Sequence, residues 1–184
     1  MSKSVLAATL SSLALLASCG TAATGDSAQA ESTSAEGDEI AIRGDWNLKS
    51  EAYGSFDEPW AAAFAPGTPV LFITEKPGTI KFVDTRARKL GTVDGAPEVD
   101  YGGQGGLGDI AFLPSETSET LDTRSIYLSW AEAGDGSTRG AVVGRGTLVC
   151  EEADACAIKG LQVIWRQTPK VTGRGHYSHR IAFS

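Results

Sequence analysis

Gln104 is a candidate for polar contact with a ligand, because it is flanked on both sides by glycines. It has the only side chain in the run 102–106, inside a stretch from Tyr101 to Pro114 that holds five glycines. Glycine allows positive φ and lets another group approach the backbone closely, so the polar contact of this loop falls to Gln104. We expect the loop to lead into a strand over 108–113 and to direct Gln104 into a shared space. A plain turn between two strands is the alternative.

His176 is the candidate for proton transfer. It lies in a second loop, 173–180, that leads into the strand-like segment 180–184 as the Gln104 loop leads into its own strand. Histidine has a pKa near 6.5, so at neutral pH it is largely neutral and can accept a proton. The other histidine, His179, is three residues away. In an extended segment these two point to opposite faces, which argues against zinc. A histidine without a chemical role is the alternative for each.

The elements that position these loops have the sequence pattern of strands. Short β-branched and aromatic runs are bounded by Gly, Pro and Asp, and no amphipathic helix follows the N-terminal segment. The predicted strands are 60–64, 70–74, 79–84, 90–93, 108–113, 125–130, 140–150, 161–167 and 180–184.

An Ala-Phe pair recurs at the end of three of these strands, at Phe64, Phe112 and Phe183. The first two phenylalanines are 48 residues apart and the last two 71, and a proline follows each of the first two pairs after one residue. A repeat near fifty residues with four short strands is typical of a β-propeller blade. We therefore predict an all-β chain that covers about two blades and the first strand of a third.

A propeller closes its ring with four or more blades. We therefore interpret the chain as the N-terminal piece of a longer protein. Alone it would expose strand edges, so we expect it to be poorly soluble and inactive by itself.

Residues 1–18 have the composition of a bacterial lipoprotein signal peptide. A positive charge at Lys3 precedes an apolar run over 5–16 that is too short to span a bilayer. The run ends in a small-residue site followed by Cys19, which resembles the lipobox whose cysteine is lipidated and becomes the first mature residue. An ordinary secretory signal is the alternative.

Residues 19–39 then read as a flexible tether, rich in Ser, Thr, Ala and Gly with only acidic charges. Such a tether reaches on the order of 25 Å. It leads to a propeller domain over 40–184. We expect a protein of the bacterial cell envelope that is held on a membrane by its lipid and faces the periplasm or the exterior.

The net charge and the cysteines of the chain limit the classes of partner and of metal site that we expect. The chain has 184 residues and a net charge of −7, without a basic cluster, so we exclude nucleic acid as a partner. Two cysteines remain outside the reducing compartment, Cys150 and Cys156, and we predict a disulfide that clamps a hairpin loop. A metal site at these cysteines is not expected, because no histidine or second cysteine pair adjoins them.

Five motifs together resemble those of one family. They are Trp60–Phe64, Leu71–Gly78, Gly103–Asp109, Ile126–Ser129 and Gly175–Arg180. In this order they resemble the soluble quinoprotein sugar dehydrogenases of the glucose/sorbosone dehydrogenase family, and most of all its aldose sugar dehydrogenase branch, over about 46–184.

The resemblance implies a six-bladed propeller that binds pyrroloquinoline quinone (PQQ) and calcium and oxidises aldoses at the anomeric hydroxyl to lactones. It implies that His176 is the general base and that Gln104 contacts the quinone and the sugar. Calcium would polarise the quinone carbonyl. The resemblance places the calcium ligands and the remaining PQQ contacts in later blades, beyond Ser184, so no metal ligand is assigned here. Gly175 and His179 depart from the family pattern, so the resemblance does not identify the sugar that is oxidised. It does not identify the electron acceptor either.

Two other functions stay open at this point, because a fold does not fix a function. One is a propeller that binds without catalysis. The other is a calcium-dependent propeller lactonase that uses no quinone. The pairing of His176 with Gln104 on loops of one rim favours the dehydrogenase.

Overall fold

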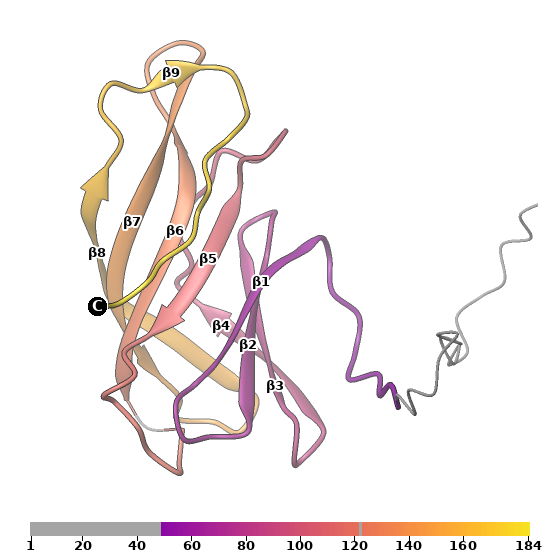
Figure 1. Cartoon of the computed structure of the whole chain (residues 1–184). Coiled ribbons are helices and arrows are strands. Elements are labelled where there is room, and N and C mark those ends of the chain that lie inside the picture. Colours follow the sequence, from indigo (N-terminus) through magenta and orange to yellow (C-terminus); the bar gives the residue numbers. More distant parts are fainter. Residues whose placement is uncertain (1–48, 122) are drawn as a thin grey trace, which may run out of the picture. The chain divides into compact units, whose positions relative to one another are not determined.

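A computed structural model describes residues 49–121 and 123–184, and within them all regular structure is β-strand. The strands, labelled in Figure 1, are β1 Pro59–Phe64, β2 Val70–Glu75, β3 Thr79–Asp84, β4 Lys89–Asp94, β5 Leu107–Phe112, β6 Arg124–Ala133, β7 Thr138–Val149, β8 Ala155–Arg166 and β9 Val171–Thr172. The lipoprotein signal, Cys19 and the tether over 19–39 lie outside the described residues.

The strands form two antiparallel units of four, β1–β4 and β5–β8, each joined in sequence order. The first strands of the two units, β1 and β5, lie against each other. The last strands, β4 and β8, pair in parallel over three residues, with Val93 opposite Cys156. Two successive four-stranded meanders with adjacent first strands are two blades of a β-propeller, which confirms the predicted fold.

The two blades share one hydrophobic core. Phe72 of β2 packs against Phe82 of β3 and against Phe112 of β5, with ring centroids 5.3 and 5.2 Å apart. Phe72, Phe82 and Phe112 are all buried. An aromatic ring of the first blade therefore packs against the inner strand of the second and joins the two blades in one core.

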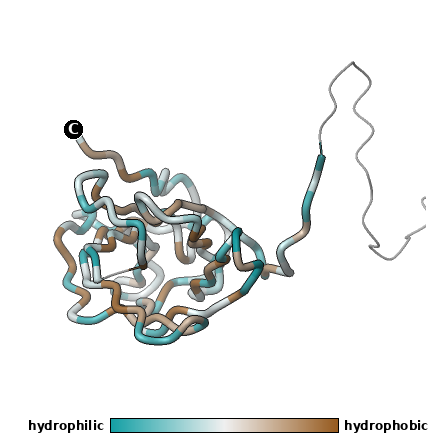
Figure 2. Tube along the Cα trace, turned by 90° about the horizontal axis from the view of Figure 1, so that it is seen from below, coloured by the Kyte–Doolittle hydropathy of each residue, from teal (hydrophilic) through white to brown (hydrophobic). Residues whose placement is uncertain are grey.

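The contact between blades is repeated at the C-terminal segment. Tyr127 takes the place of Phe72 in the second blade, and its ring lies 5.0 Å from that of Phe183. Figure 2 shows the apolar stretch that contains Phe183 in brown near the C-terminus. Phe183 thus docks on the second blade as Phe112 docks on the first, which supports the predicted repeat.

The prediction of a strand over 180–184 was wrong in one respect. These residues have no ladder partner among the described residues, so the segment is not a β-strand although it occupies the place of one. A strand is defined by its ladder of hydrogen bonds, and the docking contacts above are made by side chains instead.

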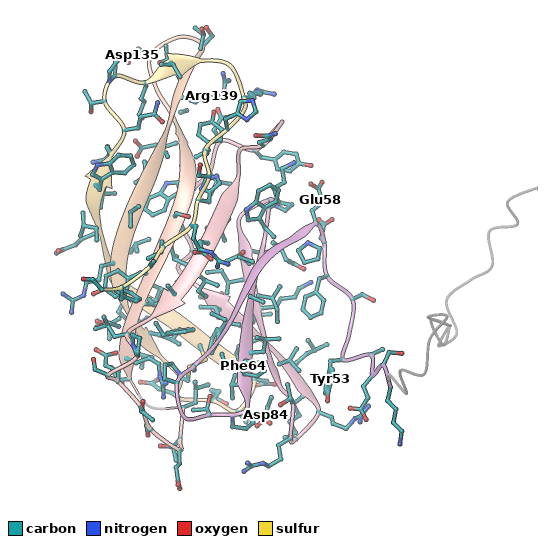
Figure 3. All side chains as sticks on the ribbon, viewed as in Figure 1. Tyr53, Glu58, Phe64, Asp84, Asp135 and Arg139 are labelled. Atoms are coloured by element: carbon teal, nitrogen blue, oxygen red, sulfur yellow. A yellow bond between two sulfur atoms is a disulfide. The ribbon has the colours of Figure 1, made fainter. Side chains whose placement is uncertain are left out.

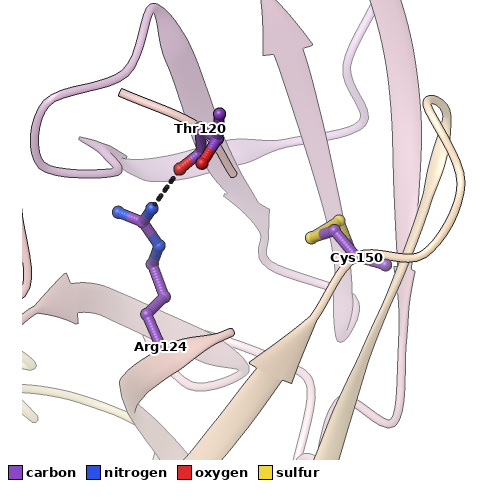
Figure 4. The surroundings of a disulfide bond; sticks show 4 residues. Thr120, Arg124 and Cys150 are labelled. Carbon is purple, nitrogen blue, oxygen red and sulfur yellow. Dashed lines mark hydrogen bonds between the residues drawn. A yellow bond between two sulfur atoms is a disulfide. The ribbon is translucent and has the colours of Figure 1, made fainter. Parts of the chain in front are cut away.

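β8 begins earlier than predicted, at Ala155 instead of 161. Ile158 pairs with Leu148 of β7, and Cys156 pairs with Val93 of β4, so residues read as part of a loop belong to the sheet. The disulfide Cys150–Cys156 lies at this place. Figure 4 shows it with Arg124, whose guanidinium donates to the Thr120 carbonyl at 2.8 Å.

No helix in the parts of the chain that the structure describes is long and apolar enough to cross a membrane.

Candidate active site

The loops that hold Gln104 and His176 are joined by hydrogen bonds. The carboxamide Oε1 of Gln104 accepts a bond of 2.6 Å from the backbone N–H of His176. The backbone N–H of Gln104 donates to the carbonyl of Arg174 at 2.7 Å. The structure therefore brings the two sequence-predicted residues to one rim. The His176 side chain is exposed there.

Glycine is required in the first loop because Arg174 passes directly over it. A Cβ on Gly103 would lie 2.4 Å from the Arg174 carbonyl oxygen, and one on Gly102 would lie 2.7 Å from its guanidinium. Both glycines also have positive φ, 137° for Gly102 and 56° for Gly103. The glycine-rich loop thus serves close backbone approach, as its sequence predicted.

The second loop carries unusual backbone. His176, Ser178 and His179 have φ of 62°, 61° and 60°, which is the left-handed region. Each such non-glycine residue costs on the order of 1 kcal/mol, so contacts elsewhere must hold this turn.

Two side chains of the second blade hold the turn at its C-terminal end. The hydroxyl of Ser129 donates to the carbonyl of His179 at 2.7 Å. The carboxylate of Asp109 accepts from the N–H of Ile181 at 2.7 Å. Ser129 and Asp109 are both buried, and they are bonded to each other through the Asp109 N–H and the Ser129 hydroxyl.

Sequence reasoning did not assign a role to Ser129 or Asp109. A signal was present: Ser129 stands in β6 where Thr74 stands in β2, and hydroxyl residues at matching places in two repeats indicate a shared contact. Asp109 appeared only as part of a family motif.

Arg180 pairs weakly with Asp109. Its Nη1 lies 3.5 Å from Asp109 Oδ1, and 80% of the Arg180 side chain is exposed against 6% for Asp109. The Arg180 guanidinium is thus mostly in solvent beside a buried carboxylate.

A third cluster supports the rim from the side. Asp100 Oδ1 accepts from Arg139 Nε of β7 at 2.7 Å and lies 4.0 Å from Arg174 Nε. Figure 3 shows Arg139 and Glu58 at one end of the blades, with Phe64 and Asp84 at the other. Neither Asp100 nor Arg174 stood out in the sequence.

His179 differs sharply from His176 in environment. It is 7% exposed, and neither ring nitrogen has a hydrogen-bond partner of normal geometry among the described residues. Burial lowers the pKa of His179 below 6.5, against weaker opposing effects of the Gln104 backbone and the Asp109 charge. Burial therefore favours the neutral form of the His179 imidazole.

A hollow of about 380 Å³ opens below the rim, between β1 and the turn. It is lined by Trp60, Ala61, Ala62, Asp109, Ser178, His179 and Arg180. Gln104 and His176 do not line it, so they lie at the rim and not in this hollow.

No group of three or more His, Cys, Asp or Glu side chains in residues 49–121 and 123–184 is arranged to hold a metal ion.

Three comparisons place this geometry among known proteins. A family model described as Glucose / Sorbosone dehydrogenase matches residues 56–184. The aldose sugar dehydrogenase YliI of Escherichia coli (strain K12) is 32% identical over 127 residues, which is 69% of this chain and 32% of that protein.

Solved structures agree. The crystal structure of a glucose dehydrogenase is similar with a TM-score of 0.60 and 34% identity, over 70% of this chain and 35% of the other. That of the soluble aldose sugar dehydrogenase (Asd) from Escherichia coli in the apo-form gives 0.59 and 31%, over 70% and 35%. The chain spans about a third of the length of these relatives. It belongs to the glucose/sorbosone dehydrogenase family.

Proposed function

We propose that the protein containing this chain is a PQQ-dependent sugar dehydrogenase that oxidises aldoses at the anomeric hydroxyl to lactones. Membership of the family and the aldose sugar dehydrogenases among its relatives support this class of reaction. The observation that carries the proposal is the 2.6 Å bond from the backbone N–H of His176 to the Gln104 carboxamide, which brings the loops that bear an imidazole and an amide to one rim.

Gln104 offers a hydrogen-bond donor of the kind that the carbonyl and carboxylate oxygens of a quinone such as PQQ would accept. Gln104 uses its carboxamide oxygen on His176, and its Nε2 has no partner among the described residues, so this nitrogen can donate to an acceptor on the ligand. Gln104 would therefore hold the cofactor or the sugar. When bound, PQQ supplies the hydride acceptor.

His176 supplies the base in this proposal. As the C1–H hydrogen leaves with its electron pair, the C1–O bond becomes a carbonyl, and the hydroxyl proton passes to the His176 imidazole. An exposed ring at the rim is suited to return that proton to solvent. The hydrogen bond from the His176 backbone N–H to Gln104 holds the backbone from which the imidazole side chain projects.

No calcium ligand is assigned in residues 49–121 and 123–184, where no group of three or more His, Cys, Asp or Glu side chains could hold a metal ion. No step here depends on calcium, which remains an expectation from the family resemblance.

We further propose that the protein is lipid-anchored through Cys19 in a bacterial cell envelope, where it meets its sugar outside the cytoplasm. The lipobox-like site and the acidic tether of the sequence support this. Radiolabelled palmitate should be incorporated by the natural protein and not by a Cys19→Ser variant.

The test of the activity is reconstitution. The natural protein, mixed with PQQ and calcium, should reduce a redox dye such as dichlorophenolindophenol when an aldose is added, and should form the lactone. Without PQQ the rate should fall to background. No dye reduction with any aldose would contradict the proposal. Lactone cleavage in place of oxidation would favour the lactonase, and sugar binding without turnover would favour a binding propeller.

A further inference from the structure

We propose that His179 is a positioning residue whose ring fills a notch above Gly108 and thereby locks the turn that presents His176. The catalytic part of this proposal rests on the proposed function. The structural part stands on the packing of His179 alone.

The notch exists because residue 108 has no side chain. A Cβ on Gly108 would lie 2.3 Å from Cγ and 2.4 Å from Nδ1 of His179, far closer than atoms can approach. The backbone of Gly108 is not in the left-handed region, so its need for glycine is purely steric. Gly108 therefore provides the space that the His179 ring occupies.

Two aromatic rings flank the notch, which borders the hollow described above. The Trp60 ring meets the His179 ring edge-on, with centroids 6.4 Å apart and planes at 87°. The Tyr177 ring lies 5.6 Å away. The ring is thus held between β1, β5 and its own turn, and it is the one buried side chain of the segment 173–180.

The turn needs such a lock because its backbone is unfavourable. Positive φ at His176, Ser178 and His179 would relax in a free loop. Ser129 and Asp109 hold the backbone of 179 and 181, and Asp109 adds only the weak contact with the exposed Arg180 side chain. The buried ring adds the side-chain contact that prevents residue 179 from rotating out, and so keeps the His176 N–H on Gln104.

The ring acts through its shape and not through its nitrogens. Neither nitrogen has a hydrogen-bond partner of normal geometry within the described residues, although both are buried, and the Gln104 backbone acts on the ring only weakly. A phenyl ring has nearly the same outline and leaves no polar atom unpaired, so it should preserve the lock. Removal of the ring should release the turn.

Four variants of the natural protein test this by hydrogen exchange of peptides that cover 173–181. His179→Ala and Gly108→Ala should each raise exchange there by about tenfold, because the turn opens more often. His179→Phe should stay within about twofold of the wild type. Hydrogen exchange in the double variant Gly108→Ala/His179→Ala should be no faster than in His179→Ala, because both changes remove the same contact. Peptides over 70–84 serve as the internal control and should not change.

In the dye assay the two single alanine variants should lower kcat by about tenfold and change KM by less than about threefold, since a base that is displaced slows the chemical step more than binding. His179→Phe should restore kcat. Wild-type exchange in Gly108→Ala, or exchange in His179→Phe equal to that in His179→Ala, would overturn the lock. A wild type that oxidises no aldose would overturn the proposed function and leave the exchange result standing as the test of the lock.

Discussion

The hydroxyl of Ser129 donates to the carbonyl of His179 at 2.7 Å, and the same hydroxyl accepts from the N–H of Asp109 at 2.9 Å. Thr74 repeats this arrangement one blade earlier: its hydroxyl donates to the Gly108 carbonyl at 2.7 Å and accepts from the Ala61 N–H at 3.1 Å. One hydroxyl on the second strand of each blade therefore joins the inner strand of its own blade to the inner segment that follows.

Removal of this hydroxyl should loosen the inner segment that it holds. Ser129→Ala leaves the buried His179 carbonyl and the Asp109 N–H without their partner, which should destabilise the protein by about 1–3 kcal/mol. Urea unfolding measures the loss, and hydrogen exchange should rise at 177–183. Thr74→Val is the matched control: it should cost a similar amount but raise exchange at 107–112 instead. Equal exchange maps for the two variants would show that the hydroxyls do not act locally.

A buried carboxylate stabilises the first blade. Glu75 accepts from Lys81 Nζ and from the Asp57 N–H, both at 2.7 Å, and from the Thr79 hydroxyl. Burial by itself would raise the pKa of Glu75, but these donors outweigh it and hold the pKa below 4.5. The charged form is therefore favoured in the folded state.

Glu75→Gln should consequently destabilise the protein at pH 7, by about 1–3 kcal/mol. Because the folded-state pKa is depressed, the stability due to Glu75 is present above the unfolded pKa near 4.5 and is lost as the pH falls through the folded value. Urea unfolding at pH 7 and at pH 3 should show a large difference between variant and wild type at the higher pH and a smaller one at the lower. A difference that does not depend on pH would contradict this role of the charge.

The buried imidazole of His179 predicts a second loss of stability toward acid, in a pH range above that of Glu75. Its folded-state pKa is below 6.5 because burial disfavours the charged ring, while Asp109 opposes this weakly and Arg180 lies mostly in solvent. The unfolded chain therefore takes up the proton first, and stability should fall as the pH drops from 6.5 toward the folded pKa. His179→Phe should remove this part of the pH dependence in thermal unfolding, whereas His176→Asn should retain it. Identical slopes for wild type and His179→Phe would contradict the assignment.

The disulfide should stabilise the pairing of the outer strands β4 and β8 and leave the stability of the loops at the rim unchanged. Cys150 and Cys156 are six residues apart, so the loop they close is short, and Cys150→Ser/Cys156→Ser should cost about 2 kcal/mol. Hydrogen exchange should rise at 89–94 and 155–159, where β4 pairs with β8. Exchange at 173–181 should stay as in the wild type. A rise at the rim would mean that the outer pairing transmits to the site.

The sequence predicted the strands well where β-branched runs end at Gly, Pro or Asp, as at Val70–Glu75 and Thr79–Asp84. It did not predict that Ala155–Lys159 belongs to β8, because this part is paired through partners in β4 and β7 that are distant in sequence. The repeat of Ala-Phe pairs located the blades because Phe112 and Phe183 each pack against an aromatic ring of the preceding blade, whereas Phe64 in the first blade is exposed.

Only two residues of the candidate site could be proposed from the sequence, and their functional roles stay predictions. Gln104 and His176 stood out as one amide among glycines and one imidazole beside an inner segment. Asp109, Ser129 and Arg174 did not, since each acts through a backbone group of a residue distant in the chain, and nothing in its own neighbourhood indicates that partner. His179 was seen as an unusual residue, but its burial over Gly108 depends on the docking of the whole segment.

The role of His176 is the central claim, and a single rate measures it most directly. In the natural protein reconstituted with PQQ and calcium, His176→Asn should keep the fold, because its side chain is exposed, and should lower kcat for aldose oxidation by about 10²–10⁴. A His176→Asn protein that is folded, binds PQQ and oxidises the sugar at the wild-type rate would contradict the account.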